Sequence, residues 1–208
     1  MTNVEYKGFA ELFRLLSEFY KFPNYEFYEY ISKEDIQNEL KELVTFTNLN
    51  YDIHILKPFA SFEEMKDEYT RTFIGINSTP VLPVESVYKV WTSDKSSSMS
   101  FANSKGYIMG DSALHIQYIL DQYGLEIPEE LGKKPDHISV LLELLGFFID
   151  NLGKLETLEF VEDHLDWLPE FKNQLEEAKA HQFYLYTTEL VIELIDDFEK
   201  MLKTEVKA

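Results

Sequence analysis

An apolar stripe with helical spacing runs through the stretch KKPDHISVLLELLGFF, residues 133–148, and constrains the fold more than any other feature. Pro135 cannot lie inside a preceding helix without losing a hydrogen bond, so a helix begins here. Asp136 is the expected N-cap, and His137 lies beside it in the first turn. Both ionisable groups are therefore held at the N-terminus of a core helix. The buried face of that helix is formed by Ile138, Leu141, Leu142, Leu145, Ile149 and Leu152.

The same three- and four-residue spacing recurs along the chain and predicts an all-α fold. Helices are expected over about 3–21, 25–31, 62–75 and 184–202, with an acidic one over 157–165. The segment 48–59 alternates like a strand, but Pro58 interrupts it, so it is interpreted as an irregular link. We expect one helical-bundle domain of about ten helices over residues 1–208. Residues 92–106, rich in Ser and Lys and without a period, are the expected mobile loop or hinge.

Several helix ends carry local signals. Ser61 with Glu64 three residues later forms a capping box, and Gly75 and Gly124 are expected C-terminal stops. Further N-caps are expected at Ser32, at Asp111 or Ser112, and at Asp166.

The formal net charge of −19 excludes whole classes of partner. Nucleic-acid binding needs a basic surface that displaces counterions from phosphates, and anionic membranes repel an acidic protein. The charge instead favours a basic partner, although an acidic surface is more often only solvated. The chain has no cysteine, which excludes thiol chemistry and fits a reducing compartment. Neither a signal peptide nor a membrane span is apparent, so we expect a cytoplasmic protein.

Catalytic motifs are not apparent. No HExxH, GxSxG, Walker or GxGxxG pattern occurs, and the five histidines form no i, i+4 pair. A triad of Ser86, His137 and Asp136 can be drawn, but adjacent Asp136 and His137 are poorly placed for it. We therefore expect no enzyme, no catalytic residue and no metal, with a zinc site from distant histidines as the alternative. Glu143 lies within an apolar helix and needs a partner unless it faces solvent.

Four blocks in order resemble the TorD/DmsD family of cytoplasmic chaperones for molybdenum-containing oxidoreductases. They span most of the chain, and the match departs from the family pattern at Thr72 and Thr79. The first two blocks are KDEYTRTFIG, with Tyr69 and Phe73, and PVLPVESVY, with Pro80, Pro83, Glu85, Ser86 and Tyr88. The other two are KKPDHISVLLELLGFF, with Pro135, Asp136, His137 and Glu143, and FVEDHLDWLPEF, with His164 and Trp167.

The resemblance implies a helical chaperone without a cofactor of its own. Such a protein binds the N-terminal, often twin-arginine, signal peptide of an apo-reductase until molybdopterin is inserted. The negative charge agrees, since such a peptide is basic and then apolar. The expected ligands of its basic part are Asp136, Glu85 and Glu143, with Ser86 and His137 beside them. The expected walls for its apolar part are Tyr69, Phe73, Tyr88 and Trp91. The structural motif residues are then Pro80, Pro83, Pro135, His164 and Trp167.

The resemblance leaves alternatives open. One is a NarJ-like assembly chaperone, whose client is not exported and lacks the arginine pair. Another is an enzyme that uses His137 with Asp136 or Glu143. Weak GTP binding and a monomer or domain-swapped homodimer, with a hinge within 92–106 or 124–135, are further expectations of the family. The sequence does not name the client.

Overall fold

The computed structural model describes residues 3–47, 51, 59–76 and 79–207, and these form helices joined by turns and irregular segments. The α-helices are α1 Asn3–Ser17, α2 Tyr25–Ser32, α3 Glu34–Phe46, α4 Phe62–Tyr69, α5 Glu85–Tyr88, α6 Asp111–Tyr123, α7 Ile138–Asn151, α8 Lys154–His164, α9 Leu168–Glu177 and α10 Gln182–Val206. Three short segments complete them: η1 Glu18–Tyr20, the π-helical η2 Thr70–Ile74 and η3 Glu129–Leu131.

The all-α prediction is confirmed. Within the described residues the one β-type contact is an isolated antiparallel bridge between Val84 and His137. The segment 48–59 lies mostly outside the described residues. No helix in the described part of the chain is both long and apolar enough to cross a membrane.

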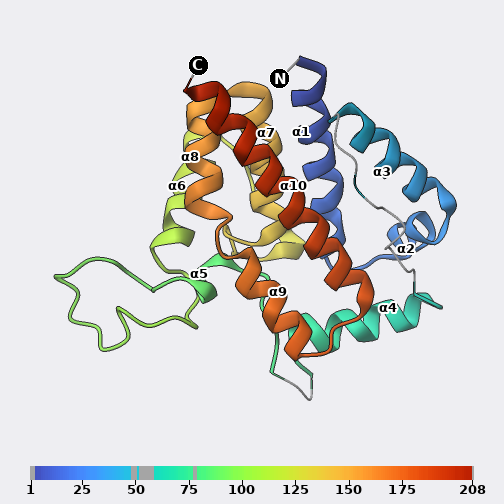
Figure 1. Ribbon diagram of the computed structural model, residues 1–208. Helices are drawn as coiled ribbons and strands as arrows, with labels where there is room; N and C mark the ends of the chain where they lie inside the picture. The colour runs from blue at the N-terminus through green and yellow to red at the C-terminus, as the bar shows by residue number, and fades with distance from the viewer. Residues whose placement is uncertain (1–2, 48–50, 52–58, 77–78, 208) are drawn as a thin grey trace.

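The long helices α1, α7 and α10 hold the core together. α7 packs on α1 on one side and α8 on the other, while α10 packs on α1, α8 and α9 (Figure 1). At the α1–α7 crossing, a Cβ added at Gly146 would lie 3.2 Å from the Ala10 carbonyl oxygen. Only glycine fits so close an approach without displacing the neighbouring helix. Buried residues from Phe9 to Leu202 form one contiguous apolar cluster. The assignment of a single domain stays a prediction.

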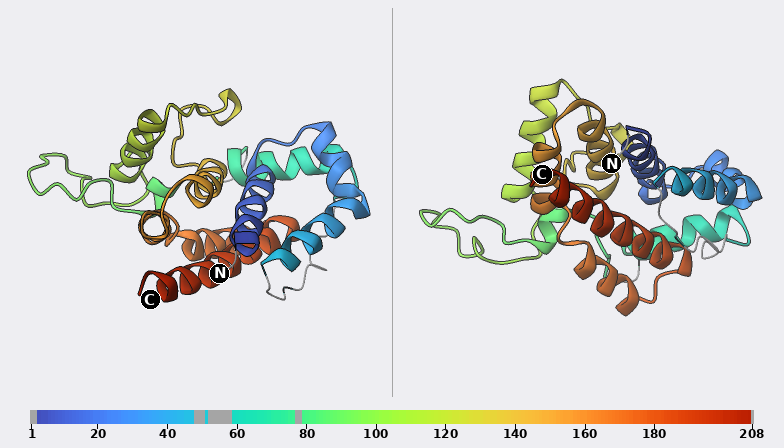
Figure 2. Two further views of the ribbon diagram at one scale, coloured as in Figure 1. Left: turned by 90° about the horizontal axis from the view of Figure 1, so that it is seen from above. Right: turned by 45° about the horizontal axis from the view of Figure 1, so that its top comes forward.

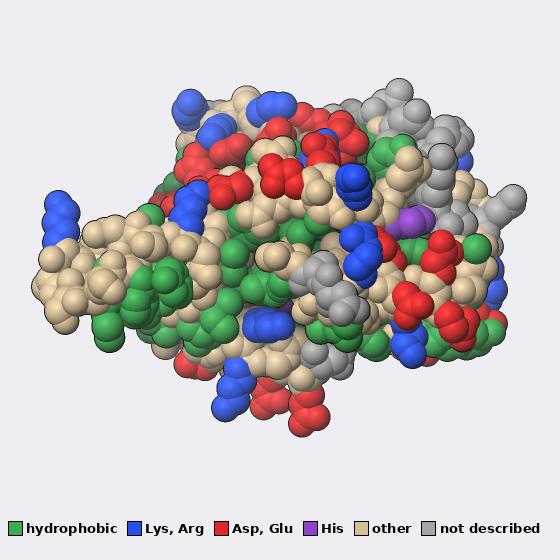
Figure 3. All heavy atoms as spheres, turned by 90° about the horizontal axis from the view of Figure 1, so that it is seen from below, with side chains coloured by type: hydrophobic (Ala, Val, Ile, Leu, Met, Phe, Trp, Pro, Cys, Tyr) green, Lys and Arg blue, Asp and Glu red, His purple; other side chains and the backbone are tan. Residues whose placement is uncertain are grey.

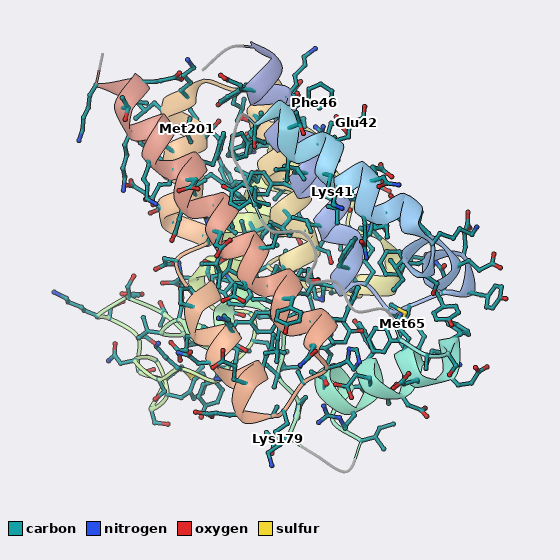
Figure 4. All side chains as sticks on the ribbon, turned by 45° about the vertical axis from the view of Figure 1, so that its right-hand side comes forward. Lys41, Glu42, Phe46, Met65, Lys179 and Met201 are labelled. Carbon is teal, nitrogen blue, oxygen red and sulfur yellow. The ribbon has the colours of Figure 1, made fainter. Side chains whose placement is uncertain are left out.

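The other helices flank this core. α3 packs on α1, α2 packs on α3 and α4 contacts α2, and Figure 4 marks α3 by Lys41, Glu42 and Phe46. Met65 of α4 is buried against the core. The turn from α9 to α10 passes through Lys179, which adopts a left-handed φ of 51° (Figure 4).

The local capping signals were right at some ends and wrong at others. Ser61 accepts from Glu64 N at 3.1 Å, and Gly75 and Gly124 end their helices in the left-handed conformation. Other N-cap predictions were wrong, because the N-cap residues are Lys33, Gly110 and Trp167 instead of Ser32, Asp111 or Ser112, and Asp166.

Residues 89–110 contain no helix or strand and project from the body between α5 and α6 (Figure 1). Trp91 and Phe101 pack edge to face at 5.0 Å, and Phe101 stacks on Tyr107 at 4.7 Å. Hydrophobic side chains gather on this projection (Figure 3). Its motion as a hinge stays a prediction.

Candidate functional site

Two motif segments that are about fifty residues apart in the sequence lie side by side. Glu85 N donates to Asp136 O and Ile138 N donates to Pro83 O, each at 3.0 Å, on either side of the Val84–His137 bridge. Pro80 and Pro83 keep the first segment extended, and Pro135 separates the second from the preceding turn. The prolines therefore align the starts of α5 and α7. The side chains of Glu85, Ser86, Asp136 and His137 lie together there, and we call this region the junction.

Asp136 does not cap α7. His137 is the N-cap residue, and its Nδ1 accepts from Ser139 N at 3.2 Å. The Asp136 carboxylate instead accepts from Ser86 N at 2.7 Å and so satisfies the first turn of α5. Burial raises the pKa of the Asp136 carboxyl and lowers the pKa of His137 to about 3. The predicted N-cap was wrong because the carboxylate reaches across the fold.

This hydrogen bond gives a first testable prediction. Asp136→Ala leaves the buried Ser86 N–H without its acceptor and is expected to lower the free energy of unfolding by about 1–3 kcal/mol. Asp136→Asn keeps an acceptor oxygen and should stay within about 1 kcal/mol of wild type. Urea denaturation of the two variants checks this, and equal losses would contradict the capping role.

Glu85 is 0% exposed and joins α5 to α8. Its carboxylate lies 2.9 Å from Lys89 Nζ and 2.9 Å from His164 Nδ1. His164 is only 2% exposed, and its backbone oxygen accepts from Trp167 Nε1 at 2.8 Å. The second nitrogen of the His164 ring lies 2.8 Å from His115 Nδ1 on α6. A chain of ionisable groups thus runs from the core to α6.

The predicted aromatic ligands lie mainly in the core. Tyr88 stacks on Trp167 with centroids 4.9 Å apart, and burial raises its pKa. Tyr69 donates to Tyr20 O at 3.2 Å, and burial raises the pKa of Tyr69 to about 12. Phe73 packs edge to face on Tyr184 at 4.8 Å.

Trp91 and Glu143 differ from these buried residues. Helix α5 ends at Tyr88, and Trp91 lies beyond it in the projecting loop. Glu143 has the partner that it needed: its carboxylate lies 2.8 Å from Lys21 Nζ, with 44% of its side chain exposed.

Burial decides how the predicted peptide ligands can act. Seven of them are buried: Tyr69, Phe73, Glu85, Ser86, Tyr88, Asp136 and His137. In this conformation they form the framework of the junction, and a peptide reaches them only if the junction opens. Their direct contact with a peptide stays a prediction.

An open groove lies beside the junction, between α6, α7 and α8, which stand together on one side of the molecule (Figure 2). We call it the α6–α8 groove; its volume is about 450 Å³. It is lined by His115, Tyr118, Ile119, Gln122, Tyr123, Phe148, Leu152, Glu156, Glu159, Phe160, Asp163 and His164. The buried junction reaches the surface here through the two histidines.

The two walls of the groove differ in chemistry. The α8 wall carries Glu156, Glu159 and Asp163 at positions i, i+3 and i+7, so the three lie on one side of the helix. Across the described chain, no lysine or arginine forms an ion pair with any of these exposed carboxylates. The α6 wall presents Tyr118 and Tyr123, which are 60% and 44% exposed. An acidic wall thus faces an aromatic one.

The sequence interpretation missed these residues. It described the helix as acidic without noticing the spacing of Glu156, Glu159 and Asp163, which was the available signal. His115 gave no signal, because its partner His164 is 49 residues away. Within the described residues, no group of three His, Cys, Asp or Glu side chains could hold a metal ion.

A model of the family described as "Nitrate reductase delta subunit" matches residues 32–178. The Haemophilus influenzae "Probable Tat proofreading chaperone DmsD" is 25% identical, over 69% of this chain and 64% of the relative. The Vibrio parahaemolyticus "Chaperone protein TorD" is 23% identical, over 62% and 60%. The chain therefore matches less than two thirds of the length of these relatives. Their names confirm the TorD/DmsD resemblance, and the named activity is that of a chaperone.

A solved structure shares the fold. The crystal structure of a proposed redox enzyme maturation protein from Archaeoglobus fulgidus aligns with a TM-score of 0.51 and 23% identity, covering 94% of this chain and 93% of the other. At this identity the likeness shows a shared fold alone.

Proposed function

Because the chain belongs to the nitrate reductase delta subunit family, we propose that it is a chaperone that binds a basic and apolar N-terminal segment of a redox enzyme during maturation. The observation that carries the proposal is the α6–α8 groove, in which three carboxylates without recorded ion pairs face an aromatic wall within the described chain. A segment with both basic and apolar side chains complements such a groove.

The finer proposal is a twin-arginine signal peptide of a molybdopterin-dependent enzyme, bound in the cytoplasm before cofactor insertion and export. Two arginines match carboxylates well, because each guanidinium can donate two parallel hydrogen bonds. The apolar stretch that follows them would lie against Tyr118, Tyr123 and Phe148. The protein itself needs no cofactor for this role, and weak GTP binding stays a separate prediction.

The test is titration calorimetry with a synthetic twin-arginine signal peptide. We expect micromolar or tighter binding that weakens as salt rises, since exposed charges attract each other less when screened. No heat at low salt, with the peptide at tenfold excess, would contradict the proposed function.

A charge-matched pair of triple variants locates the binding. The groove variant Glu156→Gln, Glu159→Gln, Asp163→Asn is expected to bind roughly 10- to 100-fold more weakly, at about 0.5–1 kcal/mol for each exposed pair. The control variant changes Glu26, Glu29 and Glu63 to Gln, which are exposed acids on α2 and α4. It alters the net charge equally and should bind nearly as wild type. Equal losses in both would mean that overall charge, not the groove, attracts the peptide.

The NarJ-like alternative is favoured by the description of the matching family as a nitrate reductase delta subunit. In that case the client segment lacks the arginine pair. A peptide with both arginines replaced by glutamine separates the two: undiminished affinity favours the NarJ-like role, and a large loss favours twin-arginine recognition.

A further inference from the structure

The chain of groups from Glu85 to His115 ends in the α6–α8 groove. Beyond His115 the groove continues into a second cavity of about 420 Å³ at the start of α6, next to Lys89 and Asp111. The two cavities share three lining residues, which we call the neck: His115, Asp163 and His164. A segment that fills both cavities must pass these side chains.

The protons along this chain follow from the donors and acceptors. The Glu85 carboxylate, 2.9 Å from the Lys89 ammonium, can only accept, so His164 Nδ1 carries a proton and donates to it. In its neutral form the His164 ring has no second N–H, and in that form its Nε2 accepts. The partner of that nitrogen is His115 Nδ1, which must then be the donor. His115 Nε2 is left as an acceptor.

Asp163 places a second acceptor at the neck. Among the described residues no lysine or arginine forms an ion pair with the Asp163 carboxylate, and Asp163 is exposed. Lys89 does not neutralise it: that ammonium contacts the carboxylates of Glu85 and Asp166, and it donates to the backbone oxygen of Asp163. The neck therefore offers a carboxylate and an imidazole lone pair.

We infer that Glu85 and His164 hold His115 in the tautomer protonated on Nδ1, so that His115 Nε2 and Asp163 together accept from one basic side chain of the bound segment. An arginine fits best, because a guanidinium presents several N–H donors in one plane. Glu85 and His164 are positioning residues, while His115 and Asp163 make the contact. The contact with a basic side chain rests on the proposed function, whereas the tautomer of His115 does not.

The groups around His115 also set a pH dependence. It faces Glu85 from α5, Lys89 just after α5, Asp163 and His164 from α8, and Asp111 one turn earlier on its own helix. Burial and the neighbouring His164 lower the pKa of His115, which keeps its ring neutral at pH 7. Protonation of His115 would turn its Nε2 into a donor and add positive charge. Affinity for a basic segment should therefore fall on acidification.

The tautomer is tested without any peptide. Long-range proton–nitrogen correlation NMR of the folded protein at pH 7.5 distinguishes a protonated nitrogen from one with a lone pair. We expect His115 to carry its proton on Nδ1, the minor tautomer of free imidazole in water. A proton on Nε2 of His115 would overturn the inference, whatever the protein binds.

Recognition at the neck is tested by a double-mutant cycle. His115→Phe keeps a ring but removes the acceptor, and we expect it to weaken an arginine-containing peptide roughly tenfold. The same substitution should change little when the arginines of the peptide are replaced by glutamine. Glu162→Gln, next to Asp163 but paired with Lys203 outside the groove, is the control and should not change affinity.

The outcomes separate the two proposals. If His115→Phe weakens both peptides equally, the neck does not recognise the basic side chain, although the chaperone proposal stands. If wild-type protein binds neither peptide, the proposed function and the neck contact fail together. The NMR measurement then still decides whether Glu85 and His164 fix the tautomer of His115.

Discussion

Replacing Glu85 by alanine is expected to lower the free energy of unfolding by about 3–5 kcal/mol, among the largest effects of any single substitution in this chain. Glu85 is completely buried, and its carboxylate is shared by His164 and Lys89. Alanine would leave His164 inside the core without its acceptor and would also leave a cavity. Lys89, whose side chain is 24% exposed, keeps its ion pair with Asp166.

Glu85→Gln distinguishes the stability lost with the charge from the stability lost with the side-chain volume. The amide keeps the volume and one acceptor oxygen, so we expect a smaller loss of about 1–2 kcal/mol. Urea unfolding followed by tryptophan fluorescence is the measurement, because Trp167 donates to the backbone of His164 and lies close to the site. Glu170→Ala, which removes an exposed partner of Lys105, is the control and should cost less than about 1 kcal/mol. A loss at Glu85→Ala no larger than this control would show that the buried network does not stabilise the fold.

Sequence patterns predicted the helices well because each helix buries a stripe that is visible locally. The stripe from Ile138 to Ile149 became α7, and the signals at Ser61 and Gly75 became real caps. These features depend on residues within four positions of one another, so the sequence alone carries them.

The prediction failed where partners are distant in the chain. Asp136 looked like a local cap but accepts from Ser86, fifty residues away. Helix α5 stops after one turn, at Tyr88. Residues of the projecting loop take the next hydrogen bonds: Gly106 N donates to Val87 O, and Trp91 N donates to Ser104 O. No local signal distinguishes these tertiary contacts from a continued helix.

At the candidate site, too, local sequence signals and contacts between distant residues differ in how well they can be predicted. The motif blocks contain Glu85, Ser86, Asp136 and His164, and the structure joins Glu85 to His164 and Asp136 to Ser86. The chemistry of exposed residues was not predictable, because it depends on which helix faces which. Glu156, Glu159 and Asp163 acquire a facing aromatic wall only when α6 and α8 come together in the fold. A burial pattern identifies the core of such a protein more readily than its binding surface.

Acidification is expected to destabilise the protein through His137, whose ring is 3% exposed and has a pKa of about 3 in the folded state. In the unfolded chain this histidine has a pKa of about 6.5. Between these values the unfolded state binds a proton that the folded state does not, so stability falls as the pH decreases. From His137 alone we expect a loss of about 2 kcal/mol at pH 5 relative to pH 7.5 or above.

The structural cause is specific, because His137 Nδ1 must keep its lone pair to accept from Ser139 N at the start of α7. His137→Asn retains a capping acceptor without a titrating group, so its free energy of unfolding should fall less steeply between pH 6.5 and 5. His181→Asn is the matched control, since His181 caps α10 in the same way but is only half-buried. Urea midpoints measured at pH 7.5, 6 and 5 give the slopes. If wild type and His137→Asn lose stability in parallel, the buried cap is not the proton-linked group, and the acid sensitivity must come from other residues.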